Sequence, residues 1–583
     1  MFVRVQRIKR PSGKIDEYVQ ILESYRDQGQ VRQRVIANLG NKLVLRNQLP
    51  ALLQILDPAP GTATESGRDA SKTATIQPTV CARYGIVWVV HHLFSALGLW
   101  EILDGVSRSR GLADRVAVLV ANRLACPSSE HALAGWLESD WVVDRQGQRV
   151  VPVWKKRGRV KVDLVWLSQF YRALDLLIQH KEEIEQRLYG RLREVFDLKV
   201  DLVFYDLTST YFEGEGPEPI ARYGYSRDGQ RKNRQVLVGL VMVNGLPIAH
   251  HVWAGHLKDE QTVEGVIEDV QRRFSVERMI FVGDRGMVST RTLSVIKRRE
   301  QGYLVGLVRR QRPEVIDYIE SATGPGTECA VGVGAAQKKA KTGVWEVAAA
   351  EPGVRVFVVH SDERQAYEQA MRERSMQRVR AKLEALRARV AKGQLKRPEK
   401  IGAAAAKILS RHHGHRYFDW RLSPQGQFEY FEHPAHLARE KQIEGKYVIQ
   451  TEEQELDAVE AVKHYKELAE VERGVRRLKD VIRMRPIYHQ TEPRVRAHIF
   501  VAALALLLER VLERKLTAAG VDLSVGDAWQ ALNTIGVVQF DVGGQKKIGI
   551  TPGSARARQV LLALGVKRIE LPSPVRNARV VTH

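Results

Sequence analysis

One stretch of the chain, residues 202–308, restricts the fold more than any other, because apolar runs, turns and amphipathic segments follow one another there in a readable order. Short apolar runs bounded by turn residues predict strands, and apolar residues at helical spacing predict helices. The dipeptide Asn244-Gly245 between two such runs is a strong hairpin signal. The predicted order is strand 202–206, strand 236–243, strand 248–253, helix 262–274, strand 279–284, helix 289–299 and strand 303–308. Three meandering strands followed by alternating helices and strands indicate a mixed α/β sheet.

Acidic residues stand at the ends of two of these apolar runs. Asp206 follows the run 202–205, and Asp284 follows the run 279–283. A carboxylate beside a buried strand is costly unless a cation or hydrogen-bond donors hold it. Far downstream, a predicted helix carries Glu472. Two strand-end aspartates and one helix glutamate are the groups that a two-metal phosphodiester site needs, and the order of elements is that of an RNase H-like fold.

The helix that carries Glu472 has a polar arc beside an apolar stripe. At 100° per residue, an arc of about 80° holds Tyr465, Leu468, Glu472, Arg476, Lys479 and Arg483. The stripe consists of Val471, Val475, Leu478 and Ile482. We therefore expect one edge of the helix to pack on a core while the next edge presents one acid amid basic groups and a tyrosine.

These residues resemble the DDE transposases of bacterial insertion sequences, in the subgroup that carries Tyr-x2-Arg-x3-Glu-x6-Lys. Tyr465, Glu472 and Lys479 match three of the four motif positions. Leu468 stands where the subgroup has arginine, and Arg476 on the same arc is the candidate substitute for that charge. The resemblance covers residues 200–310 and 445–510, with a weaker echo in the first 50 residues.

The resemblance implies an RNase H-like catalytic core and cut-and-paste transposition of DNA. Asp206, Asp284 and Glu472 would hold two Mg²⁺ ions, for which Mn²⁺ can substitute. The expected partners are double-stranded transposon ends and target DNA, bound by a homodimer. The expected DNA contacts are Tyr465, Arg476, Lys479, Arg285 and Arg483.

Each of these residues also has an ordinary structural interpretation. An aspartate after a strand is commonly a turn or capping residue, and Glu472 can form an i,i+4 ion pair with Arg476. Two other functions remain open: a catalytically inactive transposase-derived DNA-binding protein, and an RNase H-like nuclease that uses the same carboxylates. Three acids in order argue against the first, and the basic insertion described below favours the transposase over the second.

Composition points to a polyanionic partner. The 583 residues carry a formal net charge of +23 with a pI near 9.8, which favours nucleic acid. The 3 cysteines are far apart and form no disulfide framework or zinc pair, so we expect a reducing cytoplasm. The longest apolar stretch, 499–508, is too short to cross a bilayer, and no membrane partner is expected.

Changes in pattern divide the chain into segments. We expect a small N-terminal β region at 1–56, a linker at 57–80, a mostly α region at 81–199 that is a candidate for DNA binding, the catalytic core at 200–310 and 446–515, an insertion at 311–445, and a C-terminal region at 516–583 with dimerisation as its candidate role.

The insertion contains a strongly basic stretch. Residues 371–411 carry thirteen Lys/Arg against three Glu. A narrow apolar seam runs through it at Met376, Val379, Leu383, Leu386 and Val390. Two interpretations stay open: one helix of a pair with a solvated outer surface, or a basic arm that clamps DNA.

Histidines give no metal signal. His412, His413 and His415 have no acid or cysteine to complete a site. His498 lies on a strongly apolar predicted helix at 493–515, and we expect it to be a hydrogen-bonded core residue.

Overall fold

The computed structural model describes residues 2–9, 15–27, 30–41, 77–109, 111–150, 153–156, 159–162, 164–198, 202–226, 229–230, 232–258, 261–274, 276, 278–283, 289–307, 313–331, 340–542 and 545–569. The chain divides into two compact units, Met1–Ala74 and Thr75–His583.

The first unit is a three-stranded antiparallel sheet. Its strands are β1 (Phe2–Lys9), β2 (Ile15–Asp27) and β3 (Gln30–Asn41), in that order across the sheet. This confirms the small N-terminal β region that the sequence predicts.

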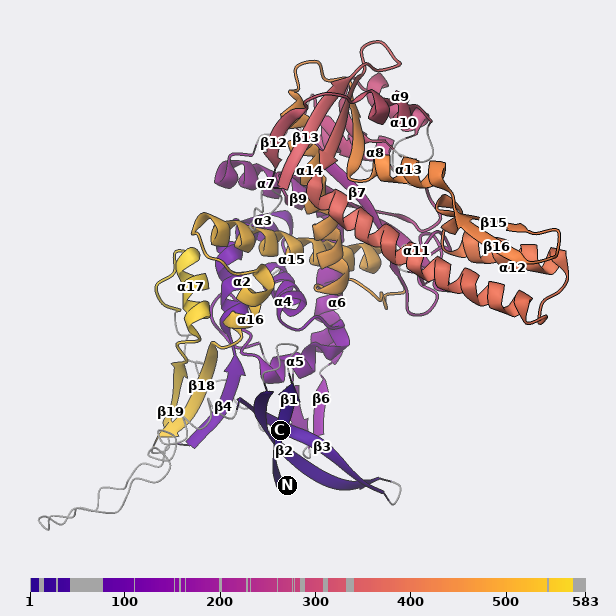
Figure 1. The fold of residues 1–583 in the computed structure, drawn as a ribbon. Helices are drawn as coiled ribbons and strands as arrows, with labels where there is room; N and C mark the ends of the chain where they lie inside the picture. The colour runs from indigo at the N-terminus through magenta and orange to yellow at the C-terminus, as the bar shows by residue number, and fades with distance from the viewer. Residues whose placement is uncertain are drawn as a thin grey trace, which may run out of the picture. The chain divides into compact units, whose positions relative to one another are not determined.

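The second unit is built on a mixed sheet of nine strands, ordered β12-β13-β14-β17-β11-β10-β7-β8-β9 (Figure 1). Five of them are β7 (Leu202–Tyr211), β8 (Gln235–Val243), β9 (Leu246–Ala254), β10 (Ile280–Gly283) and β11 (Gly302–Gly306). Strand β8 pairs antiparallel with both β7 and β9, while β10 runs parallel to both β7 and β11. A three-stranded meander with two parallel strands added at its first strand is the RNase H-like order, as predicted.

Local signals explain the connections in this part of the sheet. Asn244 and Gly245 join β8 to β9 with φ of 49° and 72°, and two positive φ values are what a tight hairpin turn requires. Helices α8 (Val263–Phe274) and α9 (Thr290–Arg298) pack against each other and lie beside the sheet. The Ser289 side chain caps α9 by accepting from the backbone N–H of Thr292.

The insertion and the segment directly after it widen the sheet by four strands that the sequence pattern did not predict. They are β12 (Thr327–Val331), β13 (Ala340–Val347), β14 (Arg355–Ser361) and β17 (Lys446–Thr451). Strand β17 is antiparallel to both β11 and β14, so it joins the insertion to the core sheet. Helix α10 (Pro313–Ser321) contacts β14 and β17.

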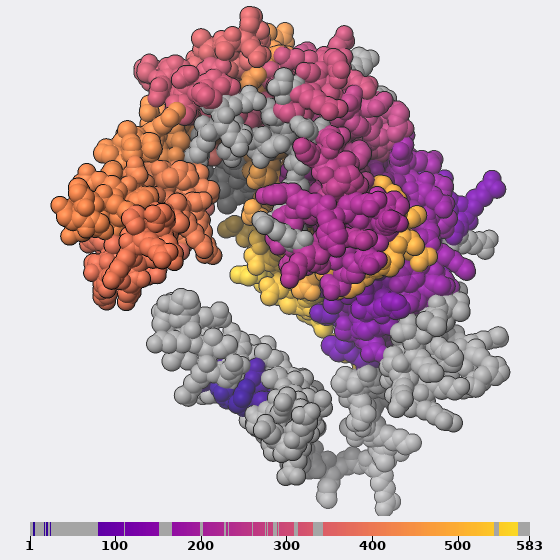
Figure 2. Space-filling view, turned by 90° about the vertical axis from the view of Figure 1, so that its right-hand side faces the viewer, coloured from indigo at the N-terminus to yellow at the C-terminus, as the bar shows by residue number. Residues whose placement is uncertain are grey.

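Between β14 and β17 the chain forms an arm with its own small core. The arm comprises α11 (Asp362–Ala391), α12 (Pro398–Arg411), β15 (Phe418–Leu422), β16 (Phe428–Glu432) and α13 (Pro434–Ile443). Four residues of the predicted seam, Met376, Val379, Leu383 and Leu386, are buried in it. This confirms that the seam belongs to one helix of a pair. Figure 2 shows the arm as a block in orange that stands out from the body of this unit.

Helices fill the region before β7, and a long apolar helix crosses it. These helices are α2 (Gly85–Ala96), α3 (Leu99–Val106), α4 (Leu112–Ala125), α5 (Leu133–Ser139), α6 (Leu164–Gln179) and α7 (Lys181–Phe196), with the β5 (Val153–Lys156) and β6 (Arg159–Val162) hairpin between α5 and α6. Helix α15 (Glu492–Ala518) contacts α4, α6 and β9. The buried apolar cluster is therefore continuous from the helices to the sheet.

Among the described residues, no single helix is both long and apolar enough to cross a membrane, and only the pair α2 and α3, bent by 71°, meets both requirements jointly. The apolar residues of both helices belong to the buried cluster.

The C-terminal segment folds back onto the beginning of the second unit. It forms α16 (Val525–Leu532), β18 (Gly536–Val542), β19 (Gln545–Ile550) and α17 (Ala555–Ala563). Strand β18 pairs antiparallel with β19 on one side and with β4 (Gln77–Arg83) on the other. Strand β4 begins within the segment expected as a linker, of which residues 57–76 lie outside the described residues.

Candidate active site

Asp206 lies within a strand and not at its end, so the predicted strand-tip position is wrong. It is the fifth residue of β7, which continues to Tyr211 and pairs with β8 up to the contact of Tyr211 with Gln235. The strand continues because its polar residues after Asp206 are buried: Thr208, Ser209 and Thr210 are each at most 1% exposed. Asp206 is half-buried, and its Oδ1 accepts from the backbone N–H of Leu207 at 2.8 Å.

The second predicted acid, Asp284, and its neighbour Arg285 lie outside the described residues. Strand β10 ends at Gly283, directly before Asp284. Its parallel register with β7 places Val282 opposite Phe204.

Glu472 lies on helix α14 (Ala458–Asp480), which crosses the sheet and contacts β7, β8, β10 and β11. The predicted stripe residues Val471, Val475 and Leu478 are buried beneath it, and Ile482, which is also buried, follows the end of the helix. This confirms the apolar stripe.

The sheet face under α14 is the face that carries Asp206. A Cβ added at Gly474 of α14 would lie 3.5 Å from the Met242 sulfur, and Met242 is paired with Phe204. Side chains two residues apart on a strand point to the same face, so Asp206 faces the same side as Phe204. On the opposite face, the Tyr205 hydroxyl bonds the Thr262 hydroxyl beside α8 at 3.0 Å.

Three residues of the polar arc of α14 remain accessible. Glu472 and Arg476 are exposed, and Lys479 is half-buried. The helix therefore presents the acid and two cations along one edge, next to the sheet face of Asp206.

The two motif residues before Glu472 are more enclosed. Tyr465 is half-buried, and its ring stacks on Tyr447 of β17 with centroids 5.8 Å apart and an interplanar angle of 28°. Leu468, where the subgroup has arginine, is 4% exposed and belongs to the core. The contact of Tyr465 with Tyr447 was missed because Tyr447 lies on β17, a strand that the sequence pattern did not predict, and no local pattern connects the two residues.

Arg483 is not on the arc of Glu472, so this part of the helical prediction is wrong. Helix α14 ends at Asp480, and Arg483 lies past it with φ of 52°. The backbone N–H of Ile482 donates to the Arg477 carbonyl and that of Met484 to the Leu478 carbonyl. These two bonds close the last turn, and the left-handed residue then redirects the chain.

Arg483 lines a cavity of about 520 Å³ between the loop after α14 and the helical region. Its lining includes three groups whose ligand atoms are within 4.8 Å of one another: Glu130, His489 and His498. His498 cannot serve a metal, because Arg123 bonds its Nδ1 at 3.1 Å and the Met484 carbonyl engages its Nε2 at 3.0 Å.

The charge state of this group fits a core network. Burial, with the charge of Arg123, lowers the pKa of His498 to about 3, so the ring is neutral. Burial would raise the pKa of Glu130, but the hydrogen bond from His489 and the charge of Arg123 outweigh it and hold that pKa below its ordinary value. The prediction of His498 as a hydrogen-bonded core residue is confirmed.

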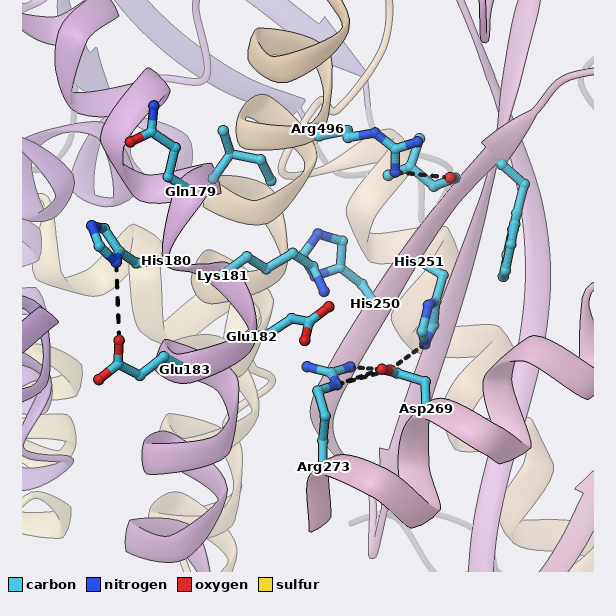
Figure 3. A pocket seen from close by; sticks show the side chains of 13 residues that line it. Gln179, His180, Lys181, Glu182, Glu183, His250, His251, Asp269, Arg273 and Arg496 are labelled. Carbon is cyan, nitrogen blue, oxygen red and sulfur yellow. Dashed lines mark hydrogen bonds and ion pairs between the residues drawn. The ribbon is translucent and has the colours of Figure 1, made fainter.

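A second cavity, of about 560 Å³, lies at the outer edge of the sheet beside β9 (Figure 3). Its side chains form ion pairs among α7, β9 and α8. The buried Glu185 carboxylate contacts Lys181 at 2.7 Å, His250 at 2.8 Å and Arg273 at 2.5 Å. In Figure 3, Arg273 and His251 converge on Asp269. These pairs brace the helical region against the edge strand, two strands away from Asp206.

Comparisons with known proteins give one family. Residues 3–56 match the N-terminal domain of IS1634 family transposases, and residues 201–508 match the transposase DDE domain. No curated protein matches the sequence significantly. Among solved structures, the piggyBac transposase synaptic complex with hairpin DNA is similar with a TM-score of 0.34 and 8% identity, over 77% of this chain and 79% of that one. Because the DDE-domain match covers more than half of the 583 residues, the chain belongs to the DDE transposases and is a DNA transposase of an insertion sequence.

Proposed function

We propose that Asp206, Asp284 and Glu472 form one metal-dependent site that cleaves the ends of the insertion sequence and joins them to target DNA. The observation that supports it best is the shared sheet face: α14, which carries Glu472, covers the face on which Asp206 lies. Asp284 follows Val282 by two residues, as Asp206 follows Phe204, and Val282 and Phe204 are paired in parallel strands. Because each aspartate follows its paired residue by two positions, we expect the two aspartates to lie side by side on neighbouring strands.

The proposed ligands suit hard divalent cations. Carboxylate oxygens are the ligands that Mg²⁺ prefers, and Mg²⁺ usually keeps several waters. Asp206 is half-buried and Glu472 is exposed, so water and a DNA strand have access to this edge. Two divalent cations bound there would supply an activated water or 3′-hydroxyl and stabilise the leaving oxygen.

The side chains of α14 would then orient the DNA. Arg476 and Lys479 lie on the same arc as Glu472, where each can hold a phosphate oxygen, Lys479 as a point charge. Leu468 is buried, so Arg476 takes over the charge that the motif arginine supplies in the subgroup. We further propose a homodimer that pairs two terminal inverted repeats, acting in the cytoplasm.

The test replaces each acid by its amide: Asp206→Asn, Asp284→Asn and Glu472→Gln. Each variant should lose cleavage in Mg²⁺ by at least about 10²–10³-fold while it binds end DNA nearly as well as the parent, since phosphate contacts dominate affinity. Glu460→Gln is the matched control, because Glu460 is an exposed acid in the first turn of the same helix.

The outcomes separate the candidate functions. A variant that retains cleavage would remove that residue from the site. A parent protein that binds end DNA but never cuts it would be an inactive DNA-binding protein. Cutting without preference for the element's ends, and without strand transfer, would identify a nuclease.

A further inference from the structure

The arm has two chemically different sides, and the position of the cations on α11 defines them. At 100° per residue, Arg378, Lys382 and Arg389 fall within an arc of about 40° on one side of the buried seam. Arg380 and Arg387 fall on the other side, toward the β15–β16 hairpin, where the Arg380 guanidinium pairs with β16 and lies over the Phe418 ring.

The hairpin side is electrostatically neutralised. Aromatic rings of the hairpin lie beneath its arginines. Three ion pairs occupy it: Arg380–Glu432 at 2.5 Å, Arg387–Glu384 at 2.9 Å and Arg421–Glu429 at 2.7 Å.

Helix α12 repeats this division. Lys400, Lys407 and Arg411 fall within an arc of about 40° on one side of its buried residues. Gly402, on the other side, lies against the hairpin, since a Cβ there would be 3.1 Å from the Trp420 ring. The three cations of α12 are therefore turned away from the hairpin, as are the three of α11.

The two groups of cations meet across the helix pair. The ammonium of Lys382 on α11 contacts His412 Nε2 at the end of α12. Desolvation lowers the pKa of His412, and the charges of Lys382, Arg378 and Arg411 lower it further. We call the resulting surface the basic face, and it consists of Arg378, Lys382, Arg389, Lys400, Lys407 and Arg411.

The basic face has no counter-charge of its own. All six side chains are exposed, and within the described part of the chain none lies within 4.0 Å of a carboxylate. Between residues 378 and 411 no large apolar side chain is exposed, so this surface lacks the apolar anchors of a membrane-binding helix. Like charges gathered without counter-charges attract a polyanion.

We propose that the basic face binds the phosphate backbone of duplex DNA, independently of sequence and apart from the catalytic acids. This inference rests on the proposed function, because it takes the element's DNA as the ligand. From Arg378 to Arg389 the helix rises about 16 Å, which matches roughly five phosphates of one strand at 3.4 Å each. The two rows of cations stand about 8–10 Å apart, the usual spacing of packed helices.

The root of the arm holds this face in a fixed direction. Arg372 of α11 pairs with Glu444 just before β17 at 3.0 Å, and Arg372 is 8% exposed. The backbone N–H of Gly445 donates to Glu368 at 3.0 Å. Gly445 has φ of 75°, and a Cβ there would approach Gln365 Cβ to 2.6 Å, so only glycine fits this close contact. The arm is thereby fastened to the sheet on both sides of its base.

The test compares two triple variants that remove the same charge from opposite sides of the arm. The face variant carries Arg378→Gln, Lys382→Gln and Arg389→Gln, and the control variant carries Arg380→Gln, Arg387→Gln and Arg421→Gln. Binding to end DNA and to random duplex is measured across a salt series. The face variant should lose about three units of salt slope and roughly 100-fold in affinity near 0.15 M salt on both DNAs, whereas the control should change by less than about threefold.

Unfolding midpoints of both variants are measured first, because equal midpoints exclude a folding defect. An unchanged salt slope in the face variant, or equal losses in both variants, would overturn the proposal. Cleavage by the unmodified protein is assayed separately, so a failure of the proposed catalytic function would not be mistaken for a failure of the basic face.

Discussion

His250 shows how a single buried side chain makes the stability of the fold depend on pH. It is 1% exposed, and its Nδ1 lies 2.8 Å from the Glu185 carboxylate that Lys181 and Arg273 also contact. Burial, with the charge of Lys181, outweighs the attraction of Glu185 and lowers the pKa of His250 to about 4. The ring is therefore neutral in the folded protein at neutral pH.

The consequence for stability follows from proton binding. An unfolded imidazole takes up a proton below about pH 6.5, whereas folded His250 resists protonation down to about pH 4. Between these values the unfolded chain binds more protons, so stability falls as the pH decreases, by about 2 kcal/mol at about pH 5 from this group alone. The substitution His250→Asn keeps an amide donor for Glu185 but removes the titration.

The measurement is the free energy of unfolding of both proteins at about pH 7.5 and about pH 5. The variant should be less stable at the higher pH, because it leaves a cavity, yet lose about 2 kcal/mol less on acidification. Equal acid losses in the two proteins would show that His250 is not the group responsible. His498, whose pKa is also depressed, titrates in both proteins and cancels in the comparison.

At the scale of elements, the angular position of a side chain around the axis of α14 decides whether it can reach DNA. Lys479 shares the arc of Glu472, while the exposed Lys463 lies on the same helix about 180° away from Glu472. Lys479→Ala should lower the cleavage rate by about 10–100-fold and change affinity for end DNA by less than about threefold, because it positions the scissile phosphate and contributes little to total charge. Lys463→Ala should change neither. Rates at saturating protein, measured beside equilibrium binding, separate the two effects, and equal losses in both variants would remove Lys479 from the site.

The same helix shows what local pattern can and cannot predict. Apolar spacing sufficed for the buried stripe of α14, because burial follows the helical period directly. The same spacing did not predict where the helix ends, because the residue with positive φ that turns the chain is Arg483 and not the glycine that usually marks such a position. It also ended β7 too early, because Thr208 and Thr210 are polar in sequence and buried in the structure.

At the scale of the whole molecule, the sequence did not predict which distant strands pair with each other. The apolar run of β14 has the pattern of a strand by itself, but its partner β17 follows only after the entire arm. The five core strands could be placed along the chain because each is a distinct apolar run, and the Asn244-Gly245 turn marks the hairpin between β8 and β9. The closure of the unit by β4 and β18 has no local signal at all, since these strands stand at opposite ends of the second unit.

This closure carries the last prediction. The backbone N–H groups of Tyr84 and Gly85 donate to the Ile535 carbonyl at 2.9 and 3.1 Å. A Cβ at Gly85 would lie 2.2 Å from the Leu532 carbonyl oxygen, so α2 begins in direct contact with the end of α16. Four apolar side chains of this segment are almost fully buried: Trp529, Leu532, Ile535 and Val537.

A chain that ends at Gly520 should therefore lose the cooperative folding of its helical region. Burying four such side chains contributes about 6–12 kcal/mol, which is comparable to the whole stability of a domain, and the truncation also leaves β4 without its partner. A chain that ends at Ile569 keeps every described element and serves as the control. Thermal unfolding and limited proteolysis should show early loss of residues 77–198 in the shorter chain and an unchanged midpoint in the control. If the shorter chain unfolds within about 2 °C of the parent, the helices before β7 are stable without the C-terminal segment. The β4–β18 pairing would then contribute little to the stability of the core.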